Sequence, residues 1–163
     1  MKSLIVFYSQ SGNTRFAAQQ IAAQTGADVL EIAPREAYPD KGFQKYFWGG
    51  KSAVMGDTPE LLPYDVNLDD YDMVILGTPV WASNITPPLR TFVCNHRDVL
   101  AAKKLALFVC FSGGGADKAV AKFKTLMNMD SLQTTLVLVD PKDRSKPQHQ
   151  AQILQFGEEL KSV

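Results

Sequence analysis

The stretch VFYSQSGNTR, from Val6 to Arg15, determines how the rest of the sequence is interpreted. Its first half belongs to the apolar run LIVFYS, which is typical of a short buried strand. Its second half is a cluster of hydroxyls, one amide and one glycine, and apolar residues at helical spacing follow it. The stretch therefore predicts a strand, a polar turn and a helix in direct succession.

Four further runs predict strands. Three of them are almost continuously apolar: MVILGT (73–78), LALFVCF (105–111) and TTLVLVD (134–140). Continuous apolar runs are typical of parallel strands that helices cover on both faces, whereas one-sided strands alternate apolar and polar residues. The fifth run, ADVLEIA from Ala27, alternates more and suits an edge strand.

Helical patterns separate these strands. The first ends near Gly26, the second opens at Thr86 with two prolines in its first turn, the third covers about 116–127, and the last begins near Pro147. Alternating strands and helices predict a three-layer α/β fold with a doubly wound, five-stranded parallel sheet. Such sheets bind ligands at the carboxyl ends of their strands. The length of 163 residues predicts a single domain over residues 1–163.

Composition excludes several classes of function. The chain has 17 basic and 17 acidic residues without a basic stripe, which argues against a nucleic-acid partner. The apolar run at the N-terminus is too short for a signal peptide or a membrane span, so we expect a cytoplasmic protein without a membrane partner. Cys94 and Cys110 lack CxxC spacing and are expected in the core. No cluster with metal-ligand spacing occurs, and no metal is expected.

The polar turn SQSGNT lies where a strand ends and a helix begins, which is where backbone N–H groups and the helix dipole bind phosphate. Gly12 allows the backbone to curl closely around a ligand. The side chains that could add hydrogen bonds are Ser9, Ser11, Asn13 and Thr14. The alternative interpretation is purely structural, with Asn13 or Thr14 as a helix cap, Gly12 as the turn residue and solvated serines.

Two other phosphate-binding motifs do not fit. A P-loop would need a glycine five residues before Gly50, where this sequence has Lys45. A dinucleotide fingerprint would need three glycines in the first turn, which has one. The turn therefore suits a monophosphate that is bound by hydroxyls and amides.

With these features the sequence resembles the flavodoxin family, whose members bind flavin mononucleotide (FMN) through three loops at the carboxyl ends of the first, third and fourth strands. The first loop is SQSGNT, the second is TPVWASN (78–84) and the third is SGGGAD (112–117). The resemblance covers essentially the whole chain and implies the short-chain form of the fold, with strand order 2-1-3-4-5. It assigns the flavin ring to Thr78, Pro79, Val80, Trp81, Ala82, Ser83, Asn84, Ser112, Gly113, Gly114, Gly115 and Asp117.

The residues of the second and third loops suit this assignment. Trp81 offers an aromatic face for stacking, and the glycines allow a backbone to pass close to the ring edge. The alternative is that Trp81 is a core aromatic and that the three glycines form a flexible connection.

A long connection, residues 33–72, separates the second and third strands. Phe43, Tyr46 and Phe47 share a helical face, and Gly49 and Gly50 predict a turn after them. The segment is either a short helix that covers the sheet edge or a lid or partner-binding wall over the flavin. Four aspartates predict a solvated connection at its end: Asp65, Asp69, Asp70 and Asp72.

The resemblance implies an electron-transfer flavoprotein that shuttles electrons between redox partner proteins, with the chemistry on FMN and no catalytic side chain. Two alternatives stay open: an NAD(P)H-dependent FMN reductase of quinones or other small electron acceptors, and a flavodoxin-like interaction module without a cofactor. Phosphorylated receiver domains share the strand order, but Ser9, Gln10 and Thr78 stand where they need acidic residues. The sequence does not indicate the oligomeric state.

Overall fold

A parallel sheet is the centre of the computed structural model, which describes the backbone of residues 1–163 and the side chains of all but Lys45 and Tyr46. Its five strands are β1 (Ser3–Phe7), β2 (Asp28–Glu31), β3 (Met73–Trp81), β5 (Lys104–Phe111) and β6 (Thr135–Val139). They lie in the order β2-β1-β3-β5-β6, which confirms the predicted order of the five parallel strands. A sixth strand, β4 (Asn84–Ile85), pairs antiparallel with the end of β3 and was not predicted, because two residues carry no hydrophobic period.

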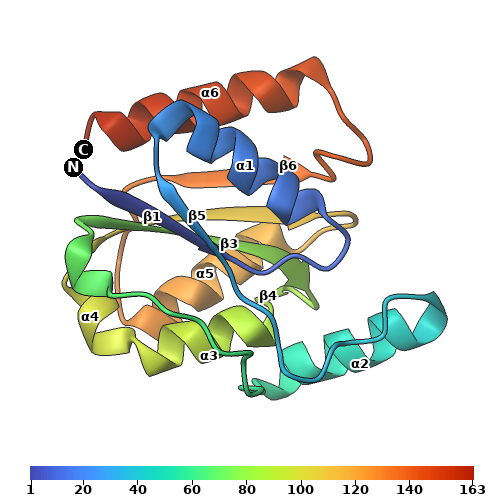
Figure 1. The fold of residues 1–163 in the computed structure, drawn as a ribbon. Helices are drawn as coiled ribbons and strands as arrows, with labels where there is room; N and C mark the ends of the chain where they lie inside the picture. Colours follow the sequence, from blue (N-terminus) through green and yellow to red (C-terminus); the bar gives the residue numbers. More distant parts are fainter.

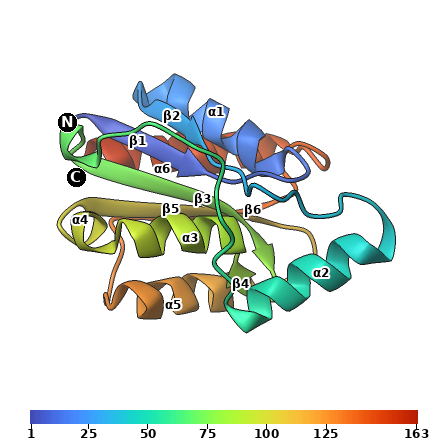
Figure 2. The same cartoon turned by 60° about the horizontal axis from the view of Figure 1, so that its bottom comes forward.

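Helices cover both faces of the sheet (Figures 1 and 2). On one face lie α1 (Asn13–Thr25) and α6 (Pro147–Lys161), and on the other lie α3 (Pro87–Asn95), α4 (Arg97–Ala101) and α5 (Ala116–Met127). A short 3-10 helix (Leu68–Asp70) precedes β3. The predicted doubly wound, three-layer architecture is therefore confirmed.

The alternation of side chains along each strand divides the core into two parts. Along β1, Leu4 and Val6 belong to the cluster on the side of α3 and α5, while Ile5 and Phe7 belong to the cluster on the side of α1 and α6. All four side chains are almost fully buried. Burial of each contributes roughly 1.5–3 kcal/mol, which holds β1 rigidly at the centre of the sheet.

Close packing also explains Gly77, which pairs with Phe108 across β3 and β5. A Cβ atom at position 77 would lie 2.1 Å from the Phe108 ring, so the ring occupies the space of a side chain. Glycine at position 77 therefore allows the Phe108 ring to pack directly on β3 just before the end of that strand.

The long connection contains a helix, α2 (Gly42–Met55), which projects away from the sheet (Figures 1 and 2). Phe43 and Phe47 lie on this helix as predicted, but they are exposed and do not cover the sheet edge. The predicted turn at Gly49 and Gly50 is wrong, because the helix runs through both residues. Tyr46, the third aromatic of the predicted face, lies outside the described side chains.

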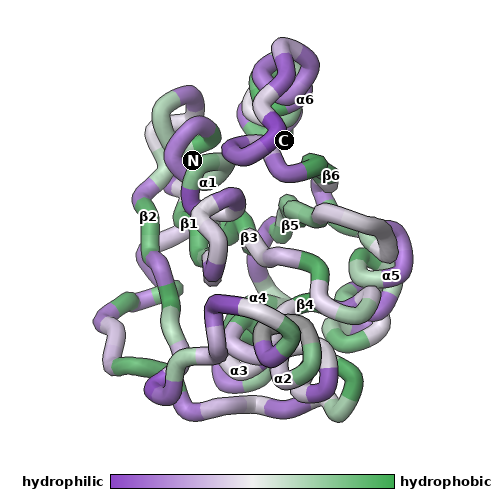
Figure 3. The backbone as a smooth tube through the Cα atoms, turned by 90° about the vertical axis from the view of Figure 1, so that its right-hand side faces the viewer, coloured by the Kyte–Doolittle hydropathy of each residue, from purple (hydrophilic) through white to green (hydrophobic). Residues whose placement is uncertain are grey.

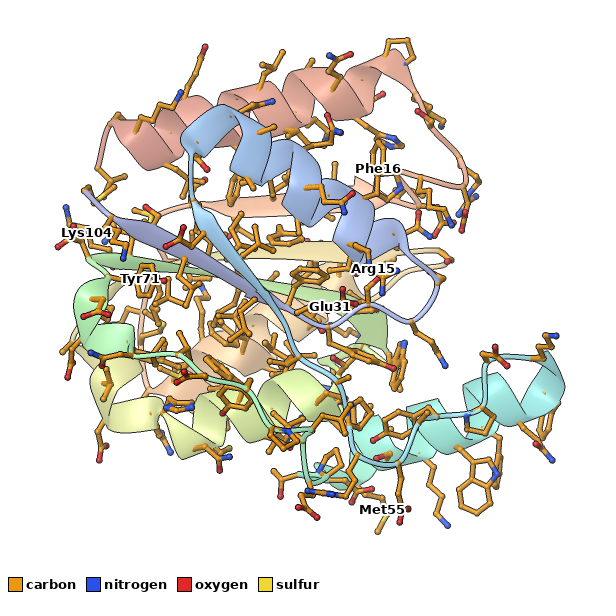
Figure 4. The ribbon with its side chains drawn as sticks, in the orientation of Figure 1. Arg15, Phe16, Glu31, Met55, Tyr71 and Lys104 are labelled. Carbon is orange, nitrogen blue, oxygen red and sulfur yellow. The ribbon has the colours of Figure 1, made fainter. Side chains whose placement is uncertain are left out.

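Gly49 has a packing role within α2. A Cβ atom at this position would lie 3.2 Å from the ring of Trp81, so glycine allows the helix to approach that ring. Met55, labelled in Figure 4, lies near the end of α2 and is exposed. The four aspartates of the connection are exposed, as predicted.

The two cysteines differ in environment. Cys110 is buried in β5 as predicted, and burial raises the pKa of its thiol to about 12, so the thiol is neutral at physiological pH. The prediction for Cys94 is wrong, because it lies on the exposed side of α3, whose buried side is formed by Leu89, Phe92 and Val93.

Two kinds of feature are missing from the described part of the chain. Its helices include none with the length and apolar character needed to cross a bilayer. Its His, Cys, Asp and Glu side chains form no cluster of three that could hold a metal ion.

Candidate functional site

A cavity of about 270 Å³ opens at the carboxyl ends of the central strands. Figure 3 views the molecule from this edge, with β2, β1, β3, β5 and β6 side by side and the connecting loops in front. The predicted residues that line the cavity are Ser11, Asn13, Thr14, Pro79, Val80, Trp81, Ala82, Ser112, Gly113 and Gly114. The predicted residues that are not part of its lining are Ser9, Gly12, Thr78, Ser83, Asn84, Gly115 and Asp117. All three predicted loops therefore meet at one cavity.

The turn between β1 and α1 presents unpaired hydrogen-bond donors. Among the described residues, none accepts a hydrogen bond from the backbone N–H groups of residues 11–14. Gly12 has a φ of 95°, a conformation that side chains with a Cβ rarely adopt, and it leads the chain directly into α1. Free N–H groups at the first turn of a 13-residue helix carry a partial positive charge that favours an anion.

Thr14 adds a side-chain donor to these amides. Its side chain is 1% exposed, and its hydroxyl oxygen, Oγ1, is buried without a hydrogen-bond partner in the part of the chain that the structure describes. An unsatisfied buried hydroxyl costs about 1–3 kcal/mol, so the site gains stability when an acceptor fills it. Amides and this hydroxyl together form an anion site without a side-chain cation inside it.

Ser9 stabilises the same helix start from behind. Its Oγ accepts a hydrogen bond from the backbone N–H of Arg15 at 3.2 Å. This bond replaces the missing side-chain cap, because the N-cap residue is Gly12. Ser9 therefore supports the turn instead of lining the cavity.

The side chain of Asn13 binds a neighbouring loop. Its Oδ1 accepts the backbone N–H groups of Lys142 (2.9 Å) and Asp143 (3.2 Å), and its Nδ2 donates to Asp143 Oδ2 (2.8 Å). Nδ2 also donates to Ser11 Oγ at 3.1 Å. These bonds fasten the loop between β6 and α6 to the turn, and they leave the backbone N–H of Asn13 for a ligand.

The second loop is a tight hairpin between β3 and β4. Trp81 and Asn84 pair across it, and the two turn residues, Ala82 and Ser83, have φ angles of 49° and 58°. Such a turn matches the twist of the strands, but left-handed angles cost residues other than glycine about 1–2 kcal/mol each. The Nδ2 of Asn84 donates to the carbonyl of Ala82 at 3.0 Å and closes the turn.

Thr78 and Thr86 hold the base of this hairpin. Both are buried, their hydroxyl oxygens lie 2.9 Å apart, and Thr78 Oγ1 accepts the backbone N–H of Thr86 at 3.0 Å. Thr78 therefore fixes the second loop on the sheet.

Trp81 forms one wall of the cavity and is held from several sides. The rings of Tyr8 and Tyr38 pack against it edge-on, with centroid distances of 5.8 Å and 5.1 Å. Burial raises the pKa of both tyrosines, so both stay neutral at physiological pH. Because Tyr38 belongs to the long connection and Gly49 to α2, this insertion supports the wall. The edge-on contacts make Trp81 a firmly positioned aromatic surface.

The third loop packs directly on the second. Gly113 and Gly114 line the cavity, while Gly115 has a φ of 85° and would place a Cβ 2.3 Å from the hydroxyl oxygen of Ser83. Glycine at position 115 therefore allows the two loops to meet. Asp117 is exposed in the first turn of α5 and does not line the cavity.

Sequence reasoning missed five lining residues: Gln10, Gly50, Cys110, Phe111 and Asp140. Asp140 follows β6 directly and accepts a hydrogen bond from Ser112 Oγ at 2.7 Å. Its position could have been found, because the carboxyl ends of all parallel strands meet at this edge. Gln10 lies in the first turn and donates from Nε2 to the carbonyl of Pro39 at 2.9 Å, which ties the turn to the long connection.

Comparisons with known proteins agree with this fold. The sequence profile of the Flavodoxin family matches residues 2–144. A flavoprotein from Lactobacillus acidophilus NCFM, crystallised in complex with FMN, is 23% identical, with 87% of this chain and 95% of that chain covered and a TM-score of 0.71.

Two further solved structures cover nearly the full length. A protein from Bacteroides eggerthii DSM 20697, assigned as a flavoprotein, is 20% identical, with 99% of this chain and 98% of that chain covered and a TM-score of 0.75. Oxidised flavodoxin 1 from Bacillus cereus is 19% identical, with 100% and 99% covered and a TM-score of 0.61. At these identities the structural likeness establishes the fold.

The left-handed turn of the second loop generates a stability prediction. Replacing Ala82 by glycine removes a Cβ from a positive-φ position, and we expect the free energy of unfolding to rise by about 0.5–1 kcal/mol after the entropy loss of glycine. Urea denaturation measures this change. The matched control is Ala23→Gly on the exposed side of α1, where the same change lowers stability by about 1 kcal/mol. A loss of stability in the Ala82 variant would contradict the strained turn.

Proposed function

This chain belongs to the flavodoxin family, and we propose that it binds FMN in the cavity and carries electrons between redox partner proteins. The observation that carries this proposal is the set of unpaired donors in the first turn, namely the N–H groups of residues 11–14 and the buried hydroxyl of Thr14. A phosphate monoester supplies the acceptors that these donors lack. The FMN complex of the similar flavoprotein from Lactobacillus acidophilus supports the choice of this phosphate ester.

The residues of the cavity fit both the phosphate and the ring of FMN. The N–H groups of residues 11–14 and Thr14 Oγ1 would hold the phosphate, and the hydroxyl of Ser11 lies beside them. Trp81 would provide a flat apolar wall for the ring. Gly113 and Gly114 would allow the third loop to run close to the opposite edge of the ring.

The chain orients the cofactor and leaves part of it accessible. FMN, when bound, supplies the redox chemistry through its ring. The cavity is rimmed by exposed residues of the second and third loops, Ala82, Ser112, Gly113 and Gly114. An exposed rim suits electron transfer to a partner protein, because the partner can approach the ring edge without any rearrangement of the loops. The Cys110 thiol in the cavity lining is neutral at physiological pH, which is consistent with chemistry on the cofactor alone.

We further propose that residues 1–163 work as one flavodoxin-like domain in the cytoplasm. The single central sheet, which contributes to both core clusters, supports the assignment of one domain. Two free cysteine thiols, one of them exposed, are typical of a reducing compartment.

The phosphate assignment predicts a large preference for FMN over riboflavin. We expect one FMN to bind per chain, and we expect Thr14→Val to weaken its binding by about 1.5–3 kcal/mol, because a hydrogen bond to a charged group is lost. Fluorescence titration of the flavin-free protein measures its affinities for FMN and for riboflavin. The control is Thr125→Val, which removes an exposed hydroxyl from α5 and leaves the affinity for FMN unchanged. Equal affinities of the unmodified protein for FMN and riboflavin would refute the phosphate site.

The ring assignment predicts quenching of Trp81 fluorescence. A flavin that stacks on this indole quenches the indole fluorescence by energy and electron transfer. The measurement uses the Trp48→Phe background, because the exposed Trp48 of α2 would contribute its own emission. We expect strong quenching at saturation with FMN. Unchanged emission from the saturated complex would place the ring away from Trp81.

The carrier assignment predicts a kinetic difference between electron donors. We expect the reduced, FMN-loaded protein to be oxidised rapidly by an artificial one-electron acceptor such as ferricyanide, because the rim of the cavity is exposed. We expect NADPH alone to reduce it slowly, because a carrier takes its electrons from a partner protein and not directly from a nicotinamide nucleotide. Stopped-flow absorbance measures both reactions. Rapid multiple turnover of NADPH with a quinone would instead identify a reductase.

A further inference from the structure

A lysine from a distant part of the chain lies against the outside of the phosphate-binding turn. The Nζ atom of Lys142, in the loop between β6 and α6, donates to the carbonyl oxygen of Ser11 at 3.1 Å. The same atom lies 3.1 Å from the place that a Cβ on Gly12 would occupy. We propose that Lys142 is a specificity-determining cation that strengthens the anion site and increases its preference for the phosphate-bearing flavin. The inference rests on the proposed binding of FMN.

The contact acts on a peptide group that belongs to the anion site. The carbonyl of Ser11 and the N–H of Gly12 are two ends of one peptide unit, and this N–H has no acceptor among the described residues. A charged donor on the carbonyl polarises the peptide, which makes its N–H a stronger donor. Lys142 therefore adds to the attraction of a phosphate in two ways, through this peptide and through its own positive charge.

Asn13 positions the lysine. Its Oδ1 accepts the backbone N–H groups of both Lys142 and Asp143, so the loop is fastened to the turn at the point from which the lysine side chain extends. Gly12 completes this arrangement, because a side chain at its position would press against the lysine. The charge of Lys142 is consequently held close to the turn even though half of its side chain is exposed.

The other two cations near the turn, Arg15 and Arg144, are each paired with a carboxylate, so Lys142 is the cation whose charge acts on the anion site. Arg15 donates from Nε to Glu31 at 2.8 Å, and the two side chains point toward each other in Figure 4. Arg144 donates from Nε to Asp140 at 2.8 Å. Each arginine is thus neutralised by a carboxylate that it contacts closely.

Asp143 partly offsets the lysine. Its Oδ1 lies 3.5 Å from the Nζ of Lys142, whereas its Oδ2 accepts the stronger hydrogen bond from Asn13 at 2.8 Å. Because this carboxylate and water both screen the lysine, the expected effect on binding is modest and depends on salt.

The test compares FMN with riboflavin in three variants. The protein without flavin is titrated with each ligand at low and at high salt, using the unmodified chain, Lys142→Met, Lys142→Arg and the control Lys146→Met. Lys146 is an exposed lysine of the same loop, and its replacement changes the net charge equally. Unlike Lys142, it makes no hydrogen bond to the Ser11 carbonyl. Thermal denaturation without flavin identifies any variant that loses its fold.

We expect Lys142→Met to weaken FMN binding about two- to fivefold at low salt, which is the range for a partly exposed charge near a helix start. The affinity of Lys142→Met for riboflavin should stay unchanged. Lys142→Arg should keep most of the preference for FMN over riboflavin. High salt should reduce the difference in FMN affinity between the unmodified protein and Lys142→Met. Lys146→Met should leave both ligands unaffected.

Three results would overturn the inference: no change in the affinity of Lys142→Met for FMN, an equal loss for both flavins, or the same effect in Lys146→Met. Unchanged affinity for FMN would mean that the charge of Lys142 does not contribute to binding. An equal loss for both flavins would mean that Lys142 only supports the structure of the site. The same effect in Lys146→Met would mean that the net charge of the protein, and not the position of Lys142, determines the affinity. Failure of the unmodified protein to prefer FMN would instead refute the proposed function.

Discussion

Four backbone N–H groups at the start of α1 find no acceptor among the described residues, and the remainder of the site is arranged around them. They are free because the first N–H groups of a helix have no acceptor within it, and β1, which is buried on both faces, places them at the sheet edge. Gly12 directs the chain into the helix, and Ser9 supports the first helical turn from behind. The fold thus keeps donors ready at a fixed place, so a ligand that accepts them does not have to order the backbone when it binds.

The loops around this turn support one another through specific contacts. Gly115 allows the third loop to meet Ser83 in the second, and the loop after β6 is fastened to the first turn by Asn13. The Ala82–Ser83 turn accepts left-handed backbone angles, which are costly for residues with a Cβ. Pairing of β3 with β4 holds these angles in place, so the strain is concentrated in the part of the chain that faces the cavity.

Sequence patterns predicted the strands, the helices and the polar first turn, because buried parallel strands and strand-to-helix turns leave strong local signals. The strand order and the second and third loops were predicted from the resemblance to the flavodoxin family. Sequence patterns did not predict the contacts between residues that lie far apart in the sequence. Asn13 was predicted among the side chains that bind phosphate, yet its amide binds Lys142 and Asp143, which are about 130 positions away in the chain. Gly49 was wrongly predicted to form a turn with Gly50, because its contact with Trp81 leaves no local signal in the sequence. Gly49 therefore marks a close approach of α2 to Trp81, and this partner could be identified only in three dimensions.

The contact between Gly49 and Trp81 also limits how this protein can be altered. The insertion that contains α2 projects from the rest of the fold (Figure 2). Its position suggests that the segment could be exchanged for another in a chimaeric protein. Yet Tyr38 and Gly49 of this insertion support the indole that forms the cavity wall. Grafting a shorter connection would remove this backing, so transplantation would have to bring a substitute for both residues. A change in the length of this connection would therefore also change the wall of the cavity.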